Sequence, residues 1–95
     1  MTDQILNQKI INYLLQYRPS KIGIFGSYSR NENNQNSDLD VLVKLEESIS
    51  LLQLVRLERE LSEILGLKVD LITEGALKNK KLRTYIEKDL VIIYQ

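Results

Sequence analysis

The chain has 95 residues, and its 13 lysine and arginine residues balance 13 aspartate and glutamate residues, so the formal net charge is zero. It contains no cysteine and no histidine, which excludes disulfide frameworks, thiol nucleophiles, zinc sites built on these ligands, and catalytic triads that need histidine. Any chemistry must come from carboxylates, hydroxyls, amines and a hard metal ion. The neutral balance argues against direct, stable nucleic-acid binding, which needs a basic surplus.

We expect one domain over residues 1–95, because domains typically contain about 100 to 150 residues. No segment approaches the roughly 18 consecutive apolar residues of a membrane-spanning helix, and the N-terminus lacks the basic segment of a signal peptide. We therefore expect a cytoplasmic protein with no membrane contact.

The first predicted element is an amphipathic helix over residues 3–17, because its apolar residues recur at spacings of three and four. Thr2 or Asp3 is the expected N-cap of this helix. Pro19 predicts its end, since proline disfavours helical geometry in the residue before it.

Two strands are predicted next, over residues 21–25 and 38–45. Between them, residues 26–27 break the first strand, residues 27–30 suit one helical turn, and the polar run 31–37 predicts a solvated loop. Alternation along the second strand puts its side chains on two faces, Asp38, Asp40, Leu42 and Lys44 on one and Leu39, Val41, Val43 and Leu45 on the other.

A long helix that ends at Leu65 is predicted after these strands, with Ser48 or Ser50 as its N-cap. Gly66 suits the left-handed position that follows a helix. The expected buried stripe of the helix consists of Leu51, Leu54, Val55, Leu61, Ile64 and Leu65.

The rest of the chain predicts a strand over residues 67–73, a short helix over residues 80–89, and a last strand or extended arm over residues 90–94. The short helix is expected to bury Leu82, Tyr85 and Ile86. This order of elements predicts an α+β fold with some α/β character. We expect a small mixed sheet of three to four strands, with helices mainly on one face and the acids on the open face.

Gly26 and Ser27, directly after a predicted strand, are the first candidates for a functional site. Glycine lets the backbone approach a ligand closely, and the N–H groups that open a helical turn, with a serine hydroxyl, suit a phosphate. A glycine-serine pair is also common in simple turns, so both interpretations stay open here.

Asp38 and Asp40 are the second candidates, since positions i and i+2 of a strand put both carboxylates on one face. Such carboxylates repel each other unless a divalent cation binds beside them, and ligand sets made only of oxygen favour Mg²⁺ or Mn²⁺. The alternative is a pair of solvated acids at the end of a strand.

Asp70 is the third candidate, because it interrupts an apolar strand in which an unpaired charge is costly. If its strand is the neighbour of the earlier acidic strand, three carboxylates cluster on one face. The alternative is an ion pair between Asp70 and Lys68 or Lys44.

Together these motifs resemble the minimal nucleotidyltransferase branch of the DNA polymerase beta-like nucleotidyltransferase superfamily. The resemblance is carried by Ile-Phe-Gly-Ser-Tyr-Ser-Arg at residues 24–30, Ser-Asp-Leu-Asp-Val-Leu-Val at residues 37–43, and Val-Asp-Leu at residues 69–71. It covers about residues 10–94, most of the chain.

The resemblance implies a nucleotidyltransferase fold and a two-metal transfer of a nucleotide, with ATP as the donor. By this likeness, Asp38 and Asp40 hold two Mg²⁺ or Mn²⁺ ions, and Asp70 completes the second metal site and assists deprotonation of the acceptor. The absence of histidine fits such a mechanism, because the metal lowers the pKa of the attacking hydroxyl.

The resemblance also implies that Gly26 and Ser27 hold the β- and γ-phosphates of the nucleotide. Arg30 follows three residues later, on the same side of a helical turn, and is a candidate phosphate clamp. The alternative is a surface arginine that pairs with Glu32.

Proteins that resemble this branch are often encoded beside a HEPN-domain ribonuclease toxin, for which they are the antitoxin. The resemblance therefore implies a hetero-oligomer in which the chain transfers AMP from ATP to a tyrosine hydroxyl of its cognate HEPN toxin. With 95 residues, the chain is expected to lack a separate acceptor domain, so that the partner presents the acceptor.

Two other functions stay open on the sequence alone. A binding-only antitoxin would occlude the toxin without chemistry and would keep neutralising it after substitution of Asp38 and Asp40. A small-molecule nucleotidyltransferase, similar to the aminoglycoside-modifying enzymes, would instead modify a free antibiotic.

Overall fold

A computed structural model describes residues 4–34 and 36–95, and every predicted helix and strand is present in it. The helices are α1 (Gln4–Leu14), α2 (Leu51–Leu65) and α3 (Lys80–Asp89), and the strands are β1 (Pro19–Phe25), β2 (Leu39–Leu45), β3 (Val69–Thr73) and β4 (Val91–Tyr94). Short 3-10 turns follow α1 and β3, at Leu15–Tyr17 and Glu74–Ala76. The N-cap predicted at Thr2 or Asp3 lies outside the described residues.

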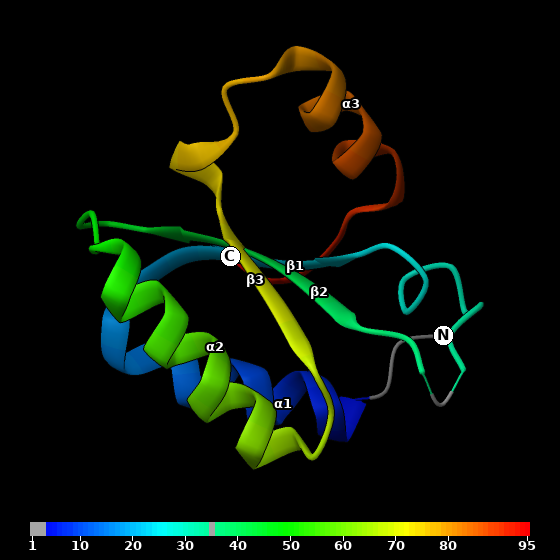
Figure 1. The fold of residues 1–95 in the computed structure, drawn as a ribbon, viewed down its shortest axis with the longest axis horizontal. Coiled ribbons are helices and arrows are strands. Elements are labelled where there is room, and N and C mark those ends of the chain that lie inside the picture. Colours follow the sequence, from blue (N-terminus) through cyan, green and yellow to red (C-terminus); the bar gives the residue numbers. More distant parts are fainter. Residues whose placement is uncertain (1–3, 35) are drawn as a thin grey trace.

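The strands form one mixed sheet in the order β3-β2-β1-β4 (Figure 1). β1 pairs antiparallel with both β2 and β4, whereas β2 and β3 are parallel. The parallel pair needs a long crossover, which α2 supplies. The predicted mixed sheet is therefore confirmed, and the last segment of the chain is a strand of this sheet.

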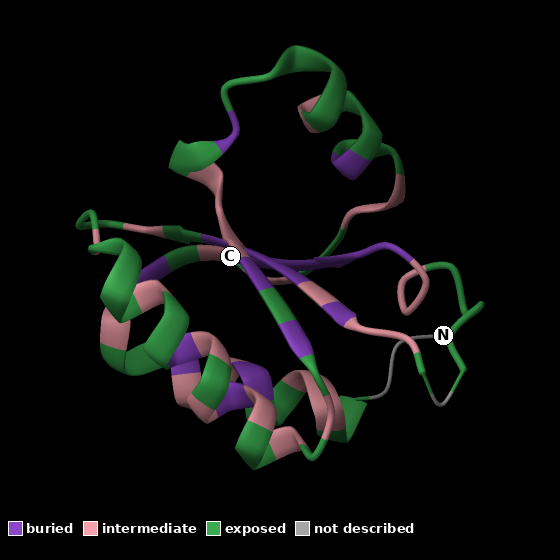
Figure 2. Ribbon diagram, viewed as in Figure 1, coloured by how far each residue is buried: buried purple, intermediate pink, exposed green. Residues whose placement is uncertain are grey.

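The main core lies between the sheet and the helices α1 and α2, which cover the same face (Figures 1 and 2). The strands contribute Ile22, Ile24, Leu39, Val41, Val43, Val69 and Leu71 to it. The helices contribute Ile10, Leu14, Leu57 and Leu61. The predicted alternation along β2 is correct, because alternate residues of a strand point to opposite faces.

The opposite face, which carries Asp40 and Asp70, is covered only in part, by α3 and the segments beside it (Figure 1). A small second cluster forms there from Phe25, Leu42, Leu77 and Ile86. The prediction that Leu82 and Tyr85 are buried is wrong, since they are 46% and 60% exposed. The reason is that α3 meets this cluster through Ile86, near its C-terminal end, so only a short part of its apolar stripe finds a partner.

The inward face of α2 differs from the predicted stripe. Leu57 is buried although the stripe omits it, whereas Leu51, Val55 and Ile64 are 75%, 55% and 48% exposed. Apolar residues lie around much of this helix, so their spacing alone does not choose which side packs on the sheet. No helix in the described part of the chain, α2 included, is long and apolar enough to cross a membrane.

The ends of α2 are those predicted, with Ser50 as N-cap and Gly66 in the left-handed region after it. The Ser50 side chain accepts a hydrogen bond from the Gln53 backbone N–H at 3.1 Å, and the Gln53 side chain accepts one from the Ser50 N–H at 3.2 Å. This reciprocal capping box satisfies two N–H groups that the helix itself leaves unpaired.

Replacing Ser50 with alanine should lower the free energy of unfolding by about 1 kcal/mol, because the first turn of α2 loses its side-chain acceptor. Ser48→Ala is the matched control, since Ser48 is exposed and outside the capping box, and it should change stability by less than about 0.5 kcal/mol. Urea unfolding of both variants measures the difference, and equal losses would contradict the role given to the capping box.

Candidate active site

β1 leads into Gly26, which is buried and has a positive φ of 76°. A Cβ atom built on this residue would collide with the Asp40 carboxylate. The position therefore requires glycine for two separate reasons, its left-handed backbone and its contact with the acid. The glycine-serine motif and the paired aspartates, separate in sequence, meet at this contact.

The residues after Gly26 form the predicted helical turn. The Gly26 carbonyl accepts hydrogen bonds from the backbone N–H groups of Ser29 and Arg30, both at 3.2 Å, and from the Ser29 hydroxyl at 2.9 Å. The first N–H groups of such a turn have no partner within it, so the end at Ser27 offers donors to an anion.

Asp40 and Asp70 lie side by side, because they are register partners in the parallel pairing of β2 and β3. On its other side, Asp40 pairs with Phe25, the last residue of β1. Asp38 immediately precedes β2. The condition set for Asp70 in the sequence analysis, that the two acidic strands are neighbours, is met, and this pairing brings Asp70 beside Asp40.

The crowding of negative charge changes the acidity of Asp40. Burial, and then the charges of Asp70 and Asp38, raise the pKa of the Asp40 carboxyl to about 6, whereas the nearby Arg30 opposes the shift. A cation bound beside Asp40 would relieve this repulsion.

The ion pair considered for Asp70 is made by Asp38 instead. Lys68 Nζ lies 3.6 Å from Asp38 Oδ2, and the lysine side chain is 75% exposed, so the pair is weak. Within residues 4–34 and 36–95, neither Lys68 nor Lys44 forms an ion pair with Asp70, which is exposed to solvent. Asp70 therefore remains available to a ligand.

The donor set of Asp38, Asp40 and Asp70 fits a hard divalent cation, because it consists only of carboxylate oxygens. In the described part of the chain, no three acidic side chains are grouped closely enough to hold an ion by themselves. This matches Mg²⁺, which usually takes one or two carboxylates and completes its shell with waters and substrate phosphates. The site fits an ion that binds together with a nucleotide better than a permanent protein cage.

Arg30 pairs with Glu32, as one of the two interpretations of the sequence predicted, and makes a further contact with Asp89 that the sequence analysis did not predict. Its Nε donates to Glu32 Oε1 at 3.1 Å, and its Nη1 donates to Asp89 Oδ2 at 2.5 Å, a hydrogen bond that raises the pKa of Arg30. Sequence reasoning misses Asp89, which lies 59 residues away. The one sequence indication is an acid in the last turn of a helix, where the helix dipole disfavours it.

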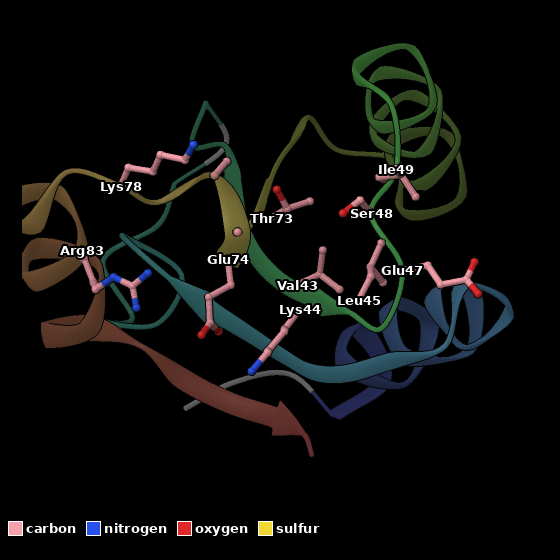
Figure 3. Close-up of a pocket in the computed structure, with 12 residues that line it drawn as sticks. Val43, Lys44, Leu45, Glu47, Ser48, Ile49, Thr73, Glu74, Lys78 and Arg83 are labelled. Atoms are coloured by element: carbon pink, nitrogen blue, oxygen red, sulfur yellow. The ribbon is translucent and has the colours of Figure 1, made fainter.

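A pocket of about 720 Å³ lies at the other end of β2 and β3, where these strands lead into the segments at residues 45–49 and 74–78 (Figure 3). Its charged lining includes Lys44, Glu74 and Arg83. Glu74 is paired with Lys21 at 2.5 Å, and this hydrogen bond, with the charges of Lys44 and Arg83, keeps the pKa of Glu74 low. None of the predicted site residues lines this pocket.

Comparison with known proteins identifies the family to which the chain belongs. The nucleotidyltransferase domain family matches residues 8–93. A Methanocaldococcus jannaschii protein with the provisional name protein adenylyltransferase MJ1217 is 47% identical over 78 residues, which are 82% of this chain and 80% of that protein. Protein adenylyltransferase MntA of Thermococcus cleftensis is 44% identical over 68 residues, 72% of this chain and 69% of that protein.

Solved structures have the same fold. A toxin-antitoxin crystal structure with AMP-PNP matches with a TM-score of 0.85 and 24% identity, over 93% of this chain and 72% of that one. A complex of tri-AMPylated Shewanella oneidensis HEPN toxin with MNT antitoxin matches with a TM-score of 0.79 and 22% identity, over 96% and 71% of the two chains. The family match and the identity to the two adenylyltransferases show that this chain belongs to the nucleotidyltransferase domain family, as its motifs predicted.

Proposed function

We propose that the chain is a protein adenylyltransferase that transfers AMP from ATP to a hydroxyl group of a partner protein. The observation that carries this proposal is the contact of Gly26 with Asp40. It places the turn after β1, which suits a phosphate, beside the neighbouring carboxylates of Asp40 and Asp70. Two relatives carry this activity in their names, and one solved structure of the same fold contains AMP-PNP.

The reaction makes one bond and breaks one. The acceptor oxygen bonds to the α-phosphorus of ATP, the bond from that phosphorus to the oxygen bridging to the β-phosphate breaks, and pyrophosphate leaves. The hydroxyl proton passes to Asp70, whose exposed carboxylate stands beside Asp40 and is free to accept it.

The turn after β1 would hold the triphosphate. The N–H group and hydroxyl of Ser27 would bind the β- and γ-phosphates, and Gly26 would let the phosphates approach the backbone without a side chain in the way. Arg30 adds a positive charge at the side of the acids, where it balances charge that develops on the leaving pyrophosphate.

Asp38, Asp40 and Asp70 would hold two Mg²⁺ ions, or Mn²⁺ in their place. When bound, these ions lower the pKa of the acceptor hydroxyl and neutralise charge on the triphosphate. The raised pKa of Asp40 makes this binding compete with protons, so acid should weaken it below about pH 6.

The proposed acceptor is a tyrosine of a HEPN-domain ribonuclease toxin, and the chain is then the antitoxin in a complex with it. The support is the AMPylated HEPN toxin in one structure of this fold. The site agrees with such an acceptor, because Asp70 is exposed on an edge strand that a folded partner is able to reach.

The double variant Asp38→Ala, Asp40→Ala tests whether neutralisation needs chemistry. Cells that express the proposed HEPN-domain toxin partner should grow with the wild-type chain and fail to grow with the variant. Co-purification of the variant with the toxin is the control, since it shows that the variant still folds and binds. Full neutralisation by the variant would overturn the enzymatic proposal in favour of an antitoxin that only binds.

A further inference from the structure

Asp89 is unfavourably placed for its own helix. It is the last residue of α3, so its carboxylate lies at the negative end of the helix dipole. Its side chain is only 16% exposed and has lost most of its contact with water. Both features disfavour a charge at this position, so a contact outside the helix must account for it.

That contact is the charge-assisted hydrogen bond from Arg30. Glu32, the other partner of Arg30, is 64% exposed and therefore holds the arginine only weakly. The backbone of Arg30 is fixed by its bond to the Gly26 carbonyl, so Asp89 determines the direction of the guanidinium group. In this direction the guanidinium lies close enough to Asp40 for its charge to act on that carboxyl.

Asp89 is itself tied to the strand that leads into the turn. β4 begins at Val91, two residues later, and pairs with β1 (Figure 1). A Cβ atom on Gly23 of β1 would clash with Leu90 at 2.6 Å and press on the Val91 carbonyl at 3.3 Å, so glycine allows this close approach. The turn after β1 and the C-terminal end of α3 are therefore both connected to β1. The ion pair between Arg30 and Asp89 links the turn directly to the end of α3.

We infer that Asp89 is a positioning residue that acts through Arg30, holding the guanidinium where the phosphates of a nucleoside triphosphate bind. The inference rests on the proposed function, because Arg30 meets a phosphate only if the site takes a nucleotide. Asp89 and Glu32 engage Nη1 and Nε, which leaves the donors on Nη2 for phosphate oxygens. An arginine that is already oriented loses less side-chain freedom when the ligand binds.

Calorimetric titration with AMP-PNP and Mg²⁺ tests this role. Asp89→Asn keeps the size of the side chain but removes its charge, and should weaken Kd about tenfold. Asp89→Glu restores the charge and should bind within about threefold of wild type. Glu32→Gln is the matched control, because it removes the exposed partner of the same arginine, and should change Kd by less than about twofold.

A double-mutant cycle with Arg30→Ala separates positioning from a general effect on the fold. If Asp89 acts through Arg30, adding Asp89→Asn to Arg30→Ala should change Kd by less than about twofold. If Asp89→Asn does not fold, Arg30→Lys is measured in its place. Lysine keeps the positive charge but lacks the planar guanidinium group that Asp89 orients. An unchanged Kd of Arg30→Lys would then overturn the inference.

Two results distinguish failure of this inference from failure of the proposed function. If the wild-type chain binds AMP-PNP and Asp89→Asn binds it equally well or more tightly, the inference is overturned while the proposed function stands. A lower Tm of Asp89→Asn with an unchanged Kd would also overturn the inference, because the Arg30–Asp89 ion pair would then stabilise the fold without affecting nucleotide binding. If the wild-type chain binds no nucleotide, both the proposed function and the inference fail.

Discussion

Replacing Asp40 with asparagine is expected to abolish transfer and to make the fold more stable at neutral pH. Transfer should fall by about a thousandfold, because this carboxylate would hold the ion that supplies several kcal/mol of transition-state stabilisation. Stability should rise by about 1 kcal/mol, after solvent screening of this half-buried group is allowed for, because the ionised carboxylate is partly buried and is also crowded by Asp70 and Asp38.

The pH dependence of this stabilisation follows from the pKa of Asp40, which is about 6 in the folded chain against an ordinary 3.8. Between these values the folded chain binds more protons than the unfolded chain, so stability falls as pH rises. The contribution of protonated Asp40 is complete below about pH 3.8 and is lost as pH rises through about 6. The gain in Tm from Asp40→Asn should therefore be large near pH 7.5 and small near about pH 4.

Thermal unfolding of wild type and Asp40→Asn across this range measures the effect. Asp70→Asn is the comparison variant, since it removes one of the charges that act on Asp40 and should give a smaller gain. Equal melting temperatures of wild type and Asp40→Asn at neutral pH would contradict the cost that burial and the neighbouring acids impose on the ionised Asp40. Undiminished transfer by Asp40→Asn would contradict its place in the site.

Gly26→Ala should also remove activity, for a steric reason. The added Cβ would collide with the Asp40 carboxylate, so either the acid or the turn must move. The left-handed φ of 76° adds a cost of about 1–2 kcal/mol for any residue with a side chain. We expect transfer to fall at least about a hundredfold, since a misplacement of roughly 1 Å has effects of this size.

Gly66→Ala is the matched control for Gly26→Ala. Gly66 has nearly the same backbone, with φ at 70°, but a Cβ atom there would meet nothing within 4 Å. It should lose about 1–2 kcal/mol of stability and keep its transfer activity. Urea unfolding and transfer assays on both variants separate the cost of the left-handed backbone from the effect of the collision with Asp40. Full activity in Gly26→Ala would contradict the close contact between the turn and Asp40.

The features of this structure that depend on neighbouring residues can be predicted from the sequence. The ends of α2 follow from the capping residue Ser50 and from Gly66, and the faces of β2 follow from alternation. These features depend on neighbours a few residues away, which a single sequence shows directly. The family of the chain follows from its glycine-serine and aspartate motifs, and the family match confirms it.

The parts that sequence reasoning misses depend on distant segments. The inward side of α2 is set by the sheet it packs on, so Leu57 is buried and Leu51 is not. The pairing of Asp40 with Asp70 depends on the order of the strands in the sheet, which the spacing of residues along the chain does not determine. The contact of Arg30 with Asp89 forms because β4, which follows α3, pairs with β1. No pattern of nearby residues in the sequence predicts this long-range pairing.

The intact mass of the proposed HEPN-domain toxin partner, after incubation with this chain, ATP and Mg²⁺, tests the central claim most directly. We expect that protein to gain one or more AMP units on a tyrosine, and to gain none with the Asp38→Ala, Asp40→Ala variant. An unchanged mass with ATP and with every other nucleoside triphosphate, while the two proteins form a complex, would contradict the claim that this chain is a protein adenylyltransferase.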